Sequence, residues 1–404
     1  MTELHVLQVL GSSAGGVARH VAQVAAAARA AGVTLAIAGP GALGERLTSG
    51  GLVPFRTVEI ADRPGPRDAV AMLRLRRLAV GADVVHAHGL RAGALTVLAC
   101  RSLRHRPAVV VTLHNLPVGG RAVTAVARLL ETVVARGADT VLGVSGDLVV
   151  RARERGATVT GRALVPAPSH PAATATPAQV RAALGVGPGE HLLVTVARLA
   201  PQKGLDLLCD TAALLAAARA HGRERSAVQP GAAATGAAGV ELVWVVAGDG
   251  PLEPDLAARI AAQGLPVRLL GRRDDVADLM GAADVVVSTA LWEGQPLGVQ
   301  EALALGAPVV ATDVGGTREV TADAAVLVPP AAAALAAAIA GLLRDPERRR
   351  RLGEAALVRA GELPDLEATM DQLTAVWAEA AERARGGRRR DADVAPSGGL
   401  GDVG

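Results

Sequence analysis

The segment that determines the fold is Leu4-His5-Val6-Leu7-Gln8-Val9-Leu10, followed directly by Gly11-Ser12-Ser13-Ala14-Gly15-Gly16. A short apolar run rich in Val and Leu predicts a strand that is buried on both faces. The glycine-rich loop leads into an alanine-rich segment up to Ala31, which predicts a helix. A buried strand, a glycine turn and a helix together predict the first unit of a doubly wound parallel sheet.

The same alternation of β-rich runs and helical segments continues along the chain. In the first half it predicts further strands at 34–38, 83–88, 109–114 and 140–145. A stretch rich in proline, alanine and threonine at 166–189 predicts a linker, after which the pattern restarts. Strands are then expected at 191–196, 241–247, 267–271, 284–288, 308–312 and 325–328. The chain is therefore predicted to be an α/β protein with two Rossmann-like doubly wound parallel-sheet domains facing across a ligand-binding cleft.

The expected boundaries follow from these composition changes. The first domain is expected at 1–168, the second at 169–365, a last amphipathic helix at 366–385, and a glycine-rich disordered tail at 386–404. The segment 221–239 has no hydrophobic period and is expected to be a surface insertion. Arg388-Arg389-Arg390 is interpreted as part of a solvated tail rather than a site for lipid or nucleic acid.

Composition limits the class of protein. The 404 residues suffice for two to three domains, half of them are hydrophobic, and the net charge of +3 is too small to require a nucleic-acid partner. Two cysteines, Cys100 and Cys209, exclude a disulfide framework and a cysteine-built zinc site. The N-terminus lacks the features of a signal peptide, and the longest uncharged stretch, 325–343, contains Pro329-Pro330. A cytoplasmic location is expected.

Lys203 is the only lysine of the chain, in which arginine supplies the other positive side chains. A GC-rich genome accounts for the general replacement of lysine by arginine. We interpret the remaining lysine as marking a place where a compact ammonium is needed and a planar guanidinium does not fit. Chance survival is the alternative.

The densest motif is Leu291-Trp292-Glu293-Gly294-Gln295-Pro296-Leu297-Gly298-Val299-Gln300-Glu301, between an expected strand and an expected helix. Pro296 at the first helical position, with glycines beside it, exposes backbone N–H groups that favour phosphate. Glu293 and Glu301 are expected about 10 Å apart along the helix axis, which suits two ends of one extended ligand. A capping glutamate plus a solvated one is the alternative.

Two further motifs belong to the same sheet edge. In Val196-Ala197-Arg198-Leu199-Ala200-Pro201-Gln202-Lys203-Gly204, two cations follow a strand and together could neutralise a diphosphate leaving group without a metal. Gly315-Gly316-Thr317 opens another helix, and its glycines either contact phosphate through N–H groups or form a tight turn.

The first domain carries weaker signals. Gly15 and Gly16 form half of a dinucleotide fingerprint, and no acidic ribose ligand follows the second strand, so NAD binding is disfavoured. His86 and His88 alternate along a strand without a carboxylate or cysteine cluster, which favours a structural role over metal binding. His114, beside Asn115, the only asparagine, is interpreted as functional.

Together these residues resemble the family-4 glycosyltransferases, retaining enzymes of the GT-B fold, with Glu293 and Glu301 in the positions of an E-x7-E motif. The resemblance covers most of the chain. It implies that the second domain binds a nucleotide-sugar, with Arg198 and Lys203 on its diphosphate and Glu301 on the ribose hydroxyls. It further implies that Glu293 and the backbone of Gly294, Gln295, Pro296 and Leu297 hold the donor sugar.

The resemblance assigns the other site residues as well. Gly271 and Arg272 lie against the base, Gly15 and Gly16 approach the donor from across the cleft, and His114 lies near the transferred sugar. The last helix crosses back to the first domain, which sets the acceptor. The implied reaction is metal-independent front-face displacement without a cofactor, and the only Asp-x-Asp, Asp391-Ala392-Asp393, is in the tail. Two departures from the family pattern are Ala197, where glycine is usual, and Gln295, where an apolar or aromatic residue is common.

The expected partners are a UDP- or GDP-sugar donor and a hydroxyl acceptor: a polysaccharide, a lipid-linked sugar, a polyol or a small molecule of bacterial carbohydrate or envelope synthesis. The alternatives are a non-catalytic nucleotide-sugar-binding protein and an epimerase or phosphorylase of the same architecture. Arginine-rich stretches suggest peripheral contact with anionic lipid at the inner face of the plasma membrane, although a solvated face explains them equally well. They comprise Arg63, Arg67, Arg74, Arg76, Arg77, Arg101, Arg104, His105 and Arg106.

Overall fold

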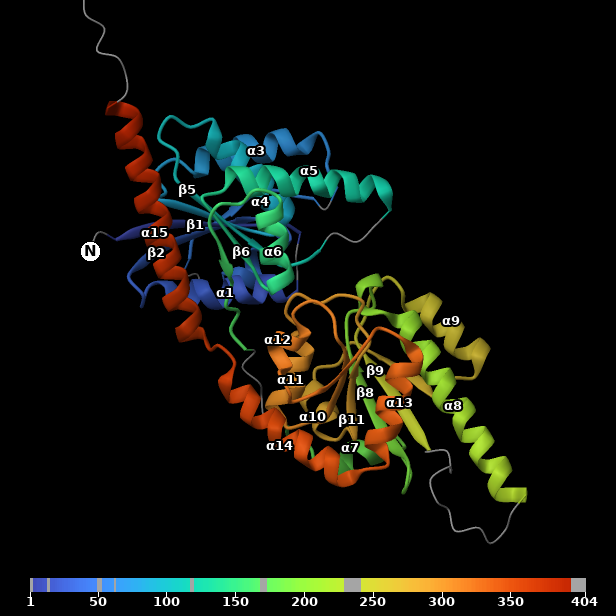
Figure 1. Cartoon of the computed structure of the whole chain (residues 1–404). Coiled ribbons are helices and arrows are strands. Elements are labelled where there is room, and N and C mark those ends of the chain that lie inside the picture. The colour runs from blue at the N-terminus through green and yellow to red at the C-terminus, as the bar shows by residue number, and fades with distance from the viewer. Residues whose placement is uncertain are drawn as a thin grey trace, which may run out of the picture. The chain divides into compact units, whose positions relative to one another are not determined.

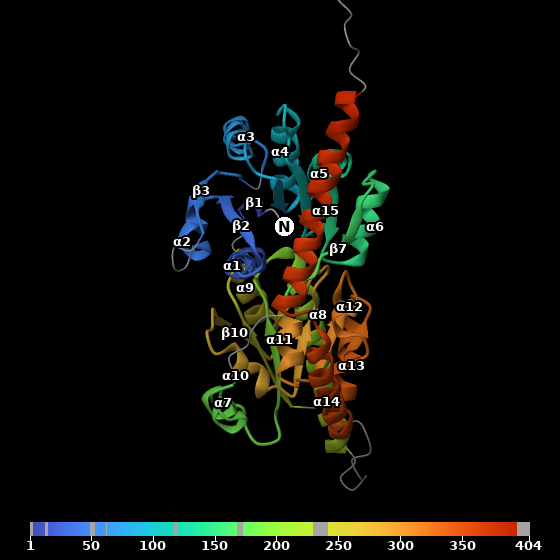
Figure 2. The ribbon, with the colours of Figure 1, turned by 90° about the vertical axis from the view of Figure 1, so that its left-hand side faces the viewer.

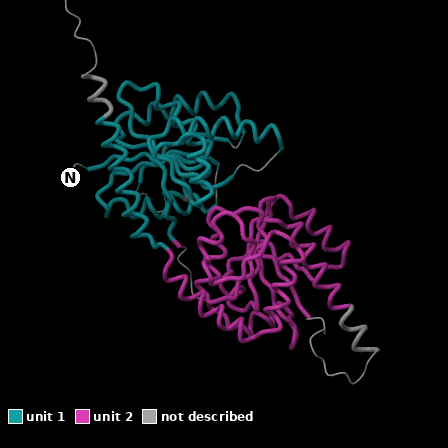
Figure 3. Tube along the Cα trace, in the orientation of Figure 1, with its two compact units in different colours: residues 1–166, 364–404 teal, residues 167–363 magenta. Residues whose placement is uncertain are grey.

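The computed structural model describes residues 3–12, 15–48, 53–61, 63–116, 120–167, 173–228 and 241–393. The chain divides into two compact units (Figure 3). Unit 1 comprises Met1–Pro166 and Pro364–Gly404, and unit 2 comprises Ala167–Leu363. The C-terminal segment therefore belongs to the same unit as the N-terminal half of the chain.

Unit 1 is built on a seven-stranded sheet in the order β3-β2-β1-β4-β5-β6-β7, in which every neighbouring pair is parallel. A parallel strand needs a crossover to return to the same end, and helices supply the crossovers. The strands are β1 (Leu4–Leu10), β2 (Val33–Gly39), β3 (Phe55–Thr57), β4 (Val84–His88), β5 (Ala108–Leu113), β6 (Thr140–Gly143) and β7 (Thr160–Arg162).

Helices cover both faces of this sheet (Figure 1). Neighbouring contacts join α3, α4 and α5 into one layer, and α1 packs with α15 on the other face. The helices of unit 1 are α1 (Gly16–Ala28), α2 (Gly44–Leu47), α3 (Arg67–Leu78), α4 (Leu90–Arg101), α5 (Arg121–Gly137), α6 (Gly146–Glu154) and α15 (Leu366–Asp393), with a 3-10 turn η1 (Gly41–Leu43).

The long helix α15 is an integral part of unit 1 and lies along its sheet beside α1 (Figures 1 and 2). The fully buried Trp377 donates from its indole Nε1 to His86 Nδ1 in β4 at 3.2 Å. Gln372 accepts from the Leu164 backbone N–H at 2.7 Å and donates to the Arg162 carbonyl at 2.8 Å. These contacts join α15 to residues that lie more than two hundred positions earlier in the sequence.

Unit 2 repeats the architecture with a six-stranded parallel sheet in the order β10-β9-β8-β11-β12-β13. Its strands are β8 (His191–Val196), β9 (Leu242–Ala247), β10 (Val267–Gly271), β11 (Val285–Ser288), β12 (Val309–Thr312) and β13 (Val326–Val328). Its helices are α7 (Pro177–Ala183), α8 (Leu205–Val228), α9 (Glu253–Gln263), α10 (Val276–Gly281), α11 (Leu297–Ala304), α12 (Thr317–Thr321), α13 (Ala332–Leu343) and α14 (Pro346–Glu362), with a 3-10 turn η2 (Pro201–Lys203).

Two apolar clusters, one on each face, form the core of unit 2. Along β9 the side chains alternate between them: Trp244 belongs to the cluster under α8 and α13, and Val243 and Val245 belong to the cluster under α10 and α11. Successive strand residues point to opposite faces, so a strand between two helical layers must be apolar at every position. The buried Trp244 satisfies its indole N–H by donating to Thr195 Oγ1 at 3.0 Å.

The prediction of two doubly wound parallel sheets is confirmed, and the expected strands coincide with β1, β2, β4–β6 and β8–β13 to within a few residues. Sequence reasoning missed β3 and β7, which are three-residue edge strands without an apolar run. It also missed α7 within the expected linker. The local signal was present, because Thr176 and Gln179 form a capping box and Pro177 stands at the first helical position.

Two expected irregular segments are partly helical. Helix α8 continues to Val228, into the segment expected to be an insertion, whereas residues 229–240 lie outside the described residues. Helix α15 continues beyond Arg385 to Asp393, since two glycines cost a helix only about 1 kcal/mol each and arginine is a good helix former. Residues 394–404 of the expected tail, like the side chains of Arg388-Arg389-Arg390 and Asp391-Ala392-Asp393, lie outside the described part.

Among the described residues, no helix has the length and apolar character needed to cross a membrane. Cys100 and Cys209 are both buried free thiols.

The packing of α15 generates a stability prediction. Trp377→Ala removes a fully buried indole and its hydrogen bond, and should lower the free energy of unfolding by about 3–5 kcal/mol. Trp377→Phe should lose less, because it keeps most of the buried area. Urea unfolding followed by circular dichroism measures both, with Leu129→Ala on the exposed side of α5 as the control. Equal losses in Trp377→Ala and Leu129→Ala would show that α15 does not stabilise unit 1.

Candidate functional site

The expected donor-site residues of unit 2 gather where its parallel strands end. The loops after β8, β11 and β12 carry residues 197–204, 289–296 and 313–316, and these three strands are neighbours in the sheet. Loops that follow the carboxyl ends of parallel strands emerge at one edge of a sheet. Segments far apart in the sequence are thereby brought together.

Lys203 and Glu293 meet at this edge in an ion pair between Lys203 Nζ and Glu293 Oε1. Lys203 ends the short turn η2 after β8, and Glu293 lies in the loop between β11 and α11. Both side chains are mostly covered, with 24% and 14% of their surfaces exposed. The structure therefore places the only lysine of the chain directly against the first glutamate of the densest motif.

Main-chain contacts hold the two loops in register. The Leu291 backbone N–H donates to the Gln202 carbonyl at 2.9 Å, and Thr289 Oγ1 donates to the Lys203 carbonyl at 3.0 Å. Gly204 follows with φ of +63°, and a Cβ there would lie 2.0 Å from the Thr289 carbonyl oxygen. Only glycine permits this approach of the two loops.

A third loop holds Glu293 from the other side. The Gly316 backbone N–H donates to the Glu293 carbonyl at 2.8 Å. Gly315 has φ of +52°, and a Cβ there would lie 2.0 Å from the same oxygen. Of the two interpretations of Gly315-Gly316, the tight turn describes this contact, because the Gly316 N–H is used within the protein.

The motif residues after Glu293 lead into α11. Gly294 and Pro296 are buried, and Gln295, Leu297 and Glu301 are partly buried. Pro296 is the N-cap of the helix rather than its first helical residue, and its carbonyl accepts from the N–H groups of Val299 and Gln300, both at 3.0 Å. The helix therefore begins one residue later than expected, and its N-terminal end lies at the same sheet edge as Lys203.

Two further predicted cations line the outer part of this edge. Arg198 is exposed and lies between two anchored residues, since Ala197 donates its N–H to the Ala247 carbonyl at 3.0 Å and Leu199 donates to the Asp249 carbonyl at 2.8 Å. Arg272 is exposed after Gly271, whose carbonyl accepts from the Gly248 N–H at 2.7 Å. The backbone at both arginines is therefore held by the sheet, while the residues themselves stay exposed.

The remaining predicted residues, His114, Gly15 and Gly16, belong to unit 1. Gly15 is the N-cap of α1 and Gly16 its first residue, and both are exposed. His114 follows β5 directly and lies within a cluster of four histidines contributed by α1, β4 and the end of β5. Its ring centroid is 5.3 Å from that of His88 and 6.1 Å from that of His20.

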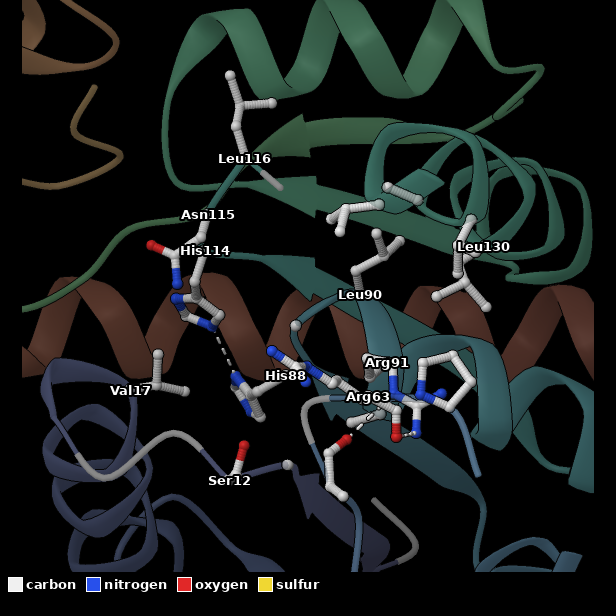
Figure 4. A pocket seen from close by; sticks show the side chains of 18 of the residues that line it. Ser12, Val17, Arg63, His88, Leu90, Arg91, His114, Asn115, Leu116 and Leu130 are labelled. Carbon is white, nitrogen blue, oxygen red and sulfur yellow. Dashed lines mark hydrogen bonds between the residues drawn. The ribbon is translucent and has the colours of Figure 1, made fainter. Parts of the chain in front are cut away.

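Hydrogen bonds order the histidine cluster. His114 Nε2 lies 3.0 Å from His88 Nδ1, and His88 Nε2 lies 2.5 Å from the buried Gln8 Oε1 (the first of these contacts is drawn in Figure 4). With the Gln8 oxygen facing His88, His88 carries its proton on Nε2, so its Nδ1 accepts from the Nε2–H of His114. The Nδ1 of a neutral His114 is then left as an acceptor.

His86 is fixed independently. An indole N–H can only donate, so Trp377 makes His86 Nδ1 an acceptor, and the His86 proton on Nε2 is directed at Thr112 Oγ1, 2.8 Å away. His86 and His88 thus have structural partners, and His88 also contacts His114.

Sequence reasoning missed Gln8, which accepts from His88. The signal was a polar residue in the middle of an otherwise apolar strand.

Burial keeps these histidines neutral. Desolvation lowers the pKa of His20 to about 4 and, together with the nearby His20, that of His86 to about 3. The pKa values of His88 and His114 lie well below the usual range for the same reason, with smaller contributions from the neighbouring histidines. Among the described residues, no group of three or more His, Cys, Asp or Glu side chains is arranged to hold a metal ion.

A pocket of about 490 Å³ opens beside His114 at the carboxyl edge of the unit 1 sheet (Figure 4). It is formed by the loop after β1, the first turn of α1, the ends of β4 and β5, residues 61, 63 and 64, and helices α4 and α5. Its volume lies in the range of pockets that enclose small organic ligands.

Comparison with protein-family models gives two matches that together cover most of the chain. Residues 14–160 match the model described as Glycosyltransferase Family 4, and residues 178–359 match that described as Glycosyl transferases group 1. The first match falls in unit 1 and the second in unit 2.

Curated relatives share part of the chain. It is 28% identical over 195 residues to alpha-D-kanosaminyltransferase of Streptomyces kanamyceticus, covering 46% of this chain and 45% of the relative. It is 34% identical over 143 residues to the lipopolysaccharide core biosynthesis mannosyltransferase LpsB of Rhizobium meliloti, covering 35% and 36%. Each match spans less than half the length of the relative.

Solved structures share the whole fold. HepE of Anabaena in complex with UDP-glucose superposes with a TM-score of 0.72 at 21% identity, covering 93% of this chain and all of that one. Sucrose-phosphate synthase of Thermosynechococcus elongatus superposes with a TM-score of 0.68 at 19% identity, covering 93% and 99%. At these identities the similarity establishes the fold.

The glycine contact at Glu293 generates a prediction. Gly315→Ala introduces a Cβ onto the Glu293 carbonyl at a positive φ, so it should displace Glu293 and cost well over 1 kcal/mol of stability. Gly341→Ala, where a Cβ meets open space within α13, is the matched control and should be neutral or slightly stabilising. Urea unfolding of both variants measures the difference, and equal behaviour would contradict the proposed contact.

The neutral histidines generate a pH prediction. Because the pKa of folded His20 lies below its unfolded value, the unfolded chain binds more protons, and stability falls as the pH drops from about 6.5 towards 4. His20 alone should contribute up to about 3 kcal/mol to this loss. Urea midpoints between pH 4 and 7 should depend less on pH in His20→Leu than in the exposed control His105→Gln. Parallel profiles for the two variants would show that His20 is not a buried neutral group.

Proposed function

The chain belongs to the family-4 glycosyltransferases, and on this premise we propose that it transfers a sugar from a nucleotide-sugar to a hydroxyl group of an acceptor. The observation that carries the proposal is the Lys203–Glu293 ion pair at the carboxyl edge of the unit 2 sheet, beside the N-terminal end of α11. A cation, a carboxylate and the N-terminal end of a helix at one edge suit a ligand that combines a diphosphate with a sugar.

The proposed donor is a UDP- or GDP-sugar. Two relatives are named as a UDP-Gal-using galactosyltransferase and a GDP-mannose-dependent mannosyltransferase, and HepE binds UDP-glucose. In the proposed complex Arg198 and Lys203 contact the diphosphate, Glu301 the ribose hydroxyls, and Gly271 and Arg272 the base. Glu293 and the backbone of residues 294–297 hold the sugar.

The proposed reaction retains the configuration of the sugar and uses no metal. The bond from the anomeric carbon to the diphosphate oxygen breaks, and the acceptor oxygen attacks from the same face. The departing phosphate oxygen takes the proton of the acceptor hydroxyl, so charges and protons balance without a separate base. Negative charge grows on the diphosphate in the transition state, where the Lys203 ammonium and the Arg198 guanidinium stabilise it.

In unit 1 the proposed roles fall to His114 and the loop before α1. A neutral His114 that donates from Nε2 to His88 offers its Nδ1 lone pair to a sugar hydroxyl. Gly15 and Gly16 provide a backbone without side chains for the approach to the donor. The acceptor is proposed to bind unit 1, and the match of residues 14–160 to the family-4 model supports this division.

A cytoplasmic location and contact with anionic lipid stay predictions. The structure adds one relevant contact, since Arg76 Nε donates to Ser102 Oγ at 3.0 Å and so places the two arginine-rich stretches beside each other.

The proposal is tested first by ligand-induced stabilisation. A thermal-shift panel of UDP, GDP and ADP with their sugar conjugates should raise the melting temperature with one nucleotide series, because a ligand of the folded state stabilises it by mass action. A shift with none of them would contradict the proposed donor class. Binding without any turnover would favour a non-catalytic binding protein, and phosphate-dependent turnover a phosphorylase.

The leaving-group roles give a sharper prediction. Lys203→Ala and Arg198→Ala should each lower the rate of nucleoside diphosphate release from the donor by about 10²–10³-fold, since each removes a charge that acts on the leaving group. Lys203→Arg should not restore the rate, because the guanidinium does not reproduce the compact ammonium. Arg348→Met, an exposed arginine on α14, is the control. Near-normal release by folded Lys203→Ala or Arg198→Ala would refute the assigned role.

A further inference from the structure

The pocket beside His114 has one polar end and one apolar wall. Figure 4 shows Ser12, His114 and Asn115 on one side of it, together with Val17 and Leu116. On the other side lie Leu90 and Leu130, together with Arg63 and Arg91. The polar side chains are those that follow β1 and β5 at the sheet edge. A molecule that fills this pocket therefore meets hydrogen-bonding groups beside His114 and aliphatic carbon along Leu90 and Leu130.

Helix α5 presents part of its apolar surface to the pocket, and another part is buried in the core. Val123, Val126 and Leu130 are spaced by three and four residues, so they lie on one face of the helix, and all three line the pocket. Val123 and Val126 keep 50% and 41% of their surfaces exposed. A contiguous exposed apolar surface around a pocket is typical of a binding site for an apolar group.

The charges of the pocket narrow the class of ligand. Its charged lining residues are Arg63 and Arg91, and none of the described lining residues is acidic. Arg91 pairs with Asp68 at 2.8 Å and donates to the carbonyls of Ala61 and Arg63, both at 3.1 Å, so it shapes the pocket wall. A cationic ligand such as an aminocyclitol meets no carboxylate among the described lining residues, and a small polyol leaves the apolar wall uncovered.

We propose that this pocket receives the apolar body of an uncharged or anionic amphipathic acceptor, whose reactive hydroxyl lies at the His114 end. The inference rests on the proposed glycosyl transfer, and it names the class of acceptor. It selects a lipid-like or aglycone-bearing acceptor over a free polyol or an aminocyclitol.

The test uses the full chain and a series of hexyl, heptyl and octyl β-D-glucosides below their micellar concentrations. Calorimetric binding should tighten by about threefold to fourfold for each added methylene, the factor expected when a methylene leaves water for an apolar pocket. Octylammonium should bind more weakly than octyl glucoside. Equal affinity along the series, or tighter binding of octylammonium, would overturn the inference.

Matched variants test whether the alkyl glucosides bind in this pocket. Val123→Gln and Val126→Gln should weaken octyl glucoside binding at least threefold, and both positions are exposed enough to accept glutamine without unfolding. Val150→Gln is the control, because Val150 is a valine of similar exposure, 53%, on α6 outside the pocket lining. Equal weakening by all three variants would show that the glucosides bind non-specifically, and would overturn the proposal.

The thermal-shift panel separates this inference from the proposed function. A nucleotide shift without chain-length-dependent glucoside binding overturns the acceptor class and leaves the transfer reaction in place. Glucoside binding without a shift by any nucleotide contradicts the transferase and leaves an amphiphile pocket.

Discussion

The constraint on which the structure depends is that all strands of each sheet run parallel. Parallel pairing is possible only when every strand returns through a crossover, so helices cover both faces and the strands must be apolar on both sides. The same constraint brings the carboxyl ends of all strands to one edge. Lys203, Glu293 and Gly316 follow three different strands, β8, β11 and β12, and they meet because those strands are neighbours.

At that edge of unit 2, backbone contacts hold the loops together, and the side chains of Lys203 and Glu293 form an ion pair. Glycines at 204 and 315 let neighbouring loops touch carbonyl oxygens that any side chain would displace. The contacts leave Glu293 held through its own carbonyl while its carboxylate pairs with Lys203. A carboxylate and an ammonium held at one edge are pre-positioned for the donor that we propose, and pre-positioned charges are what stabilisation of developing charge requires.

Unit 1 holds His114, whose function is proposed above, by a buried polar network instead. Gln8, His88 and His114 form a chain of hydrogen bonds, and Trp377 from the last helix fixes His86 beside it. Burial, with a smaller contribution from the neighbouring histidines, lowers the pKa values of these imidazoles, so the network stays uncharged and compatible with the apolar sheet around it. Helix α15 thus fixes His86, which is the ring neighbour of His88 in the histidine cluster beside the pocket.

Local patterns in the sequence determined the two parallel sheets, nearly all their strands and the loops that carry Arg198, Lys203, Glu293 and His114. Apolar runs, glycine turns and proline at helix starts report on neighbours within a few residues, and that suffices for elements of this kind. The tertiary structure alone decided which distant groups meet: Lys203 with Glu293, Gly316 with the Glu293 carbonyl, and Gln8 with His88. The order of the strands in each sheet and the close approach of their loops determine those pairs. Neither can be deduced from the spacing of residues along the chain.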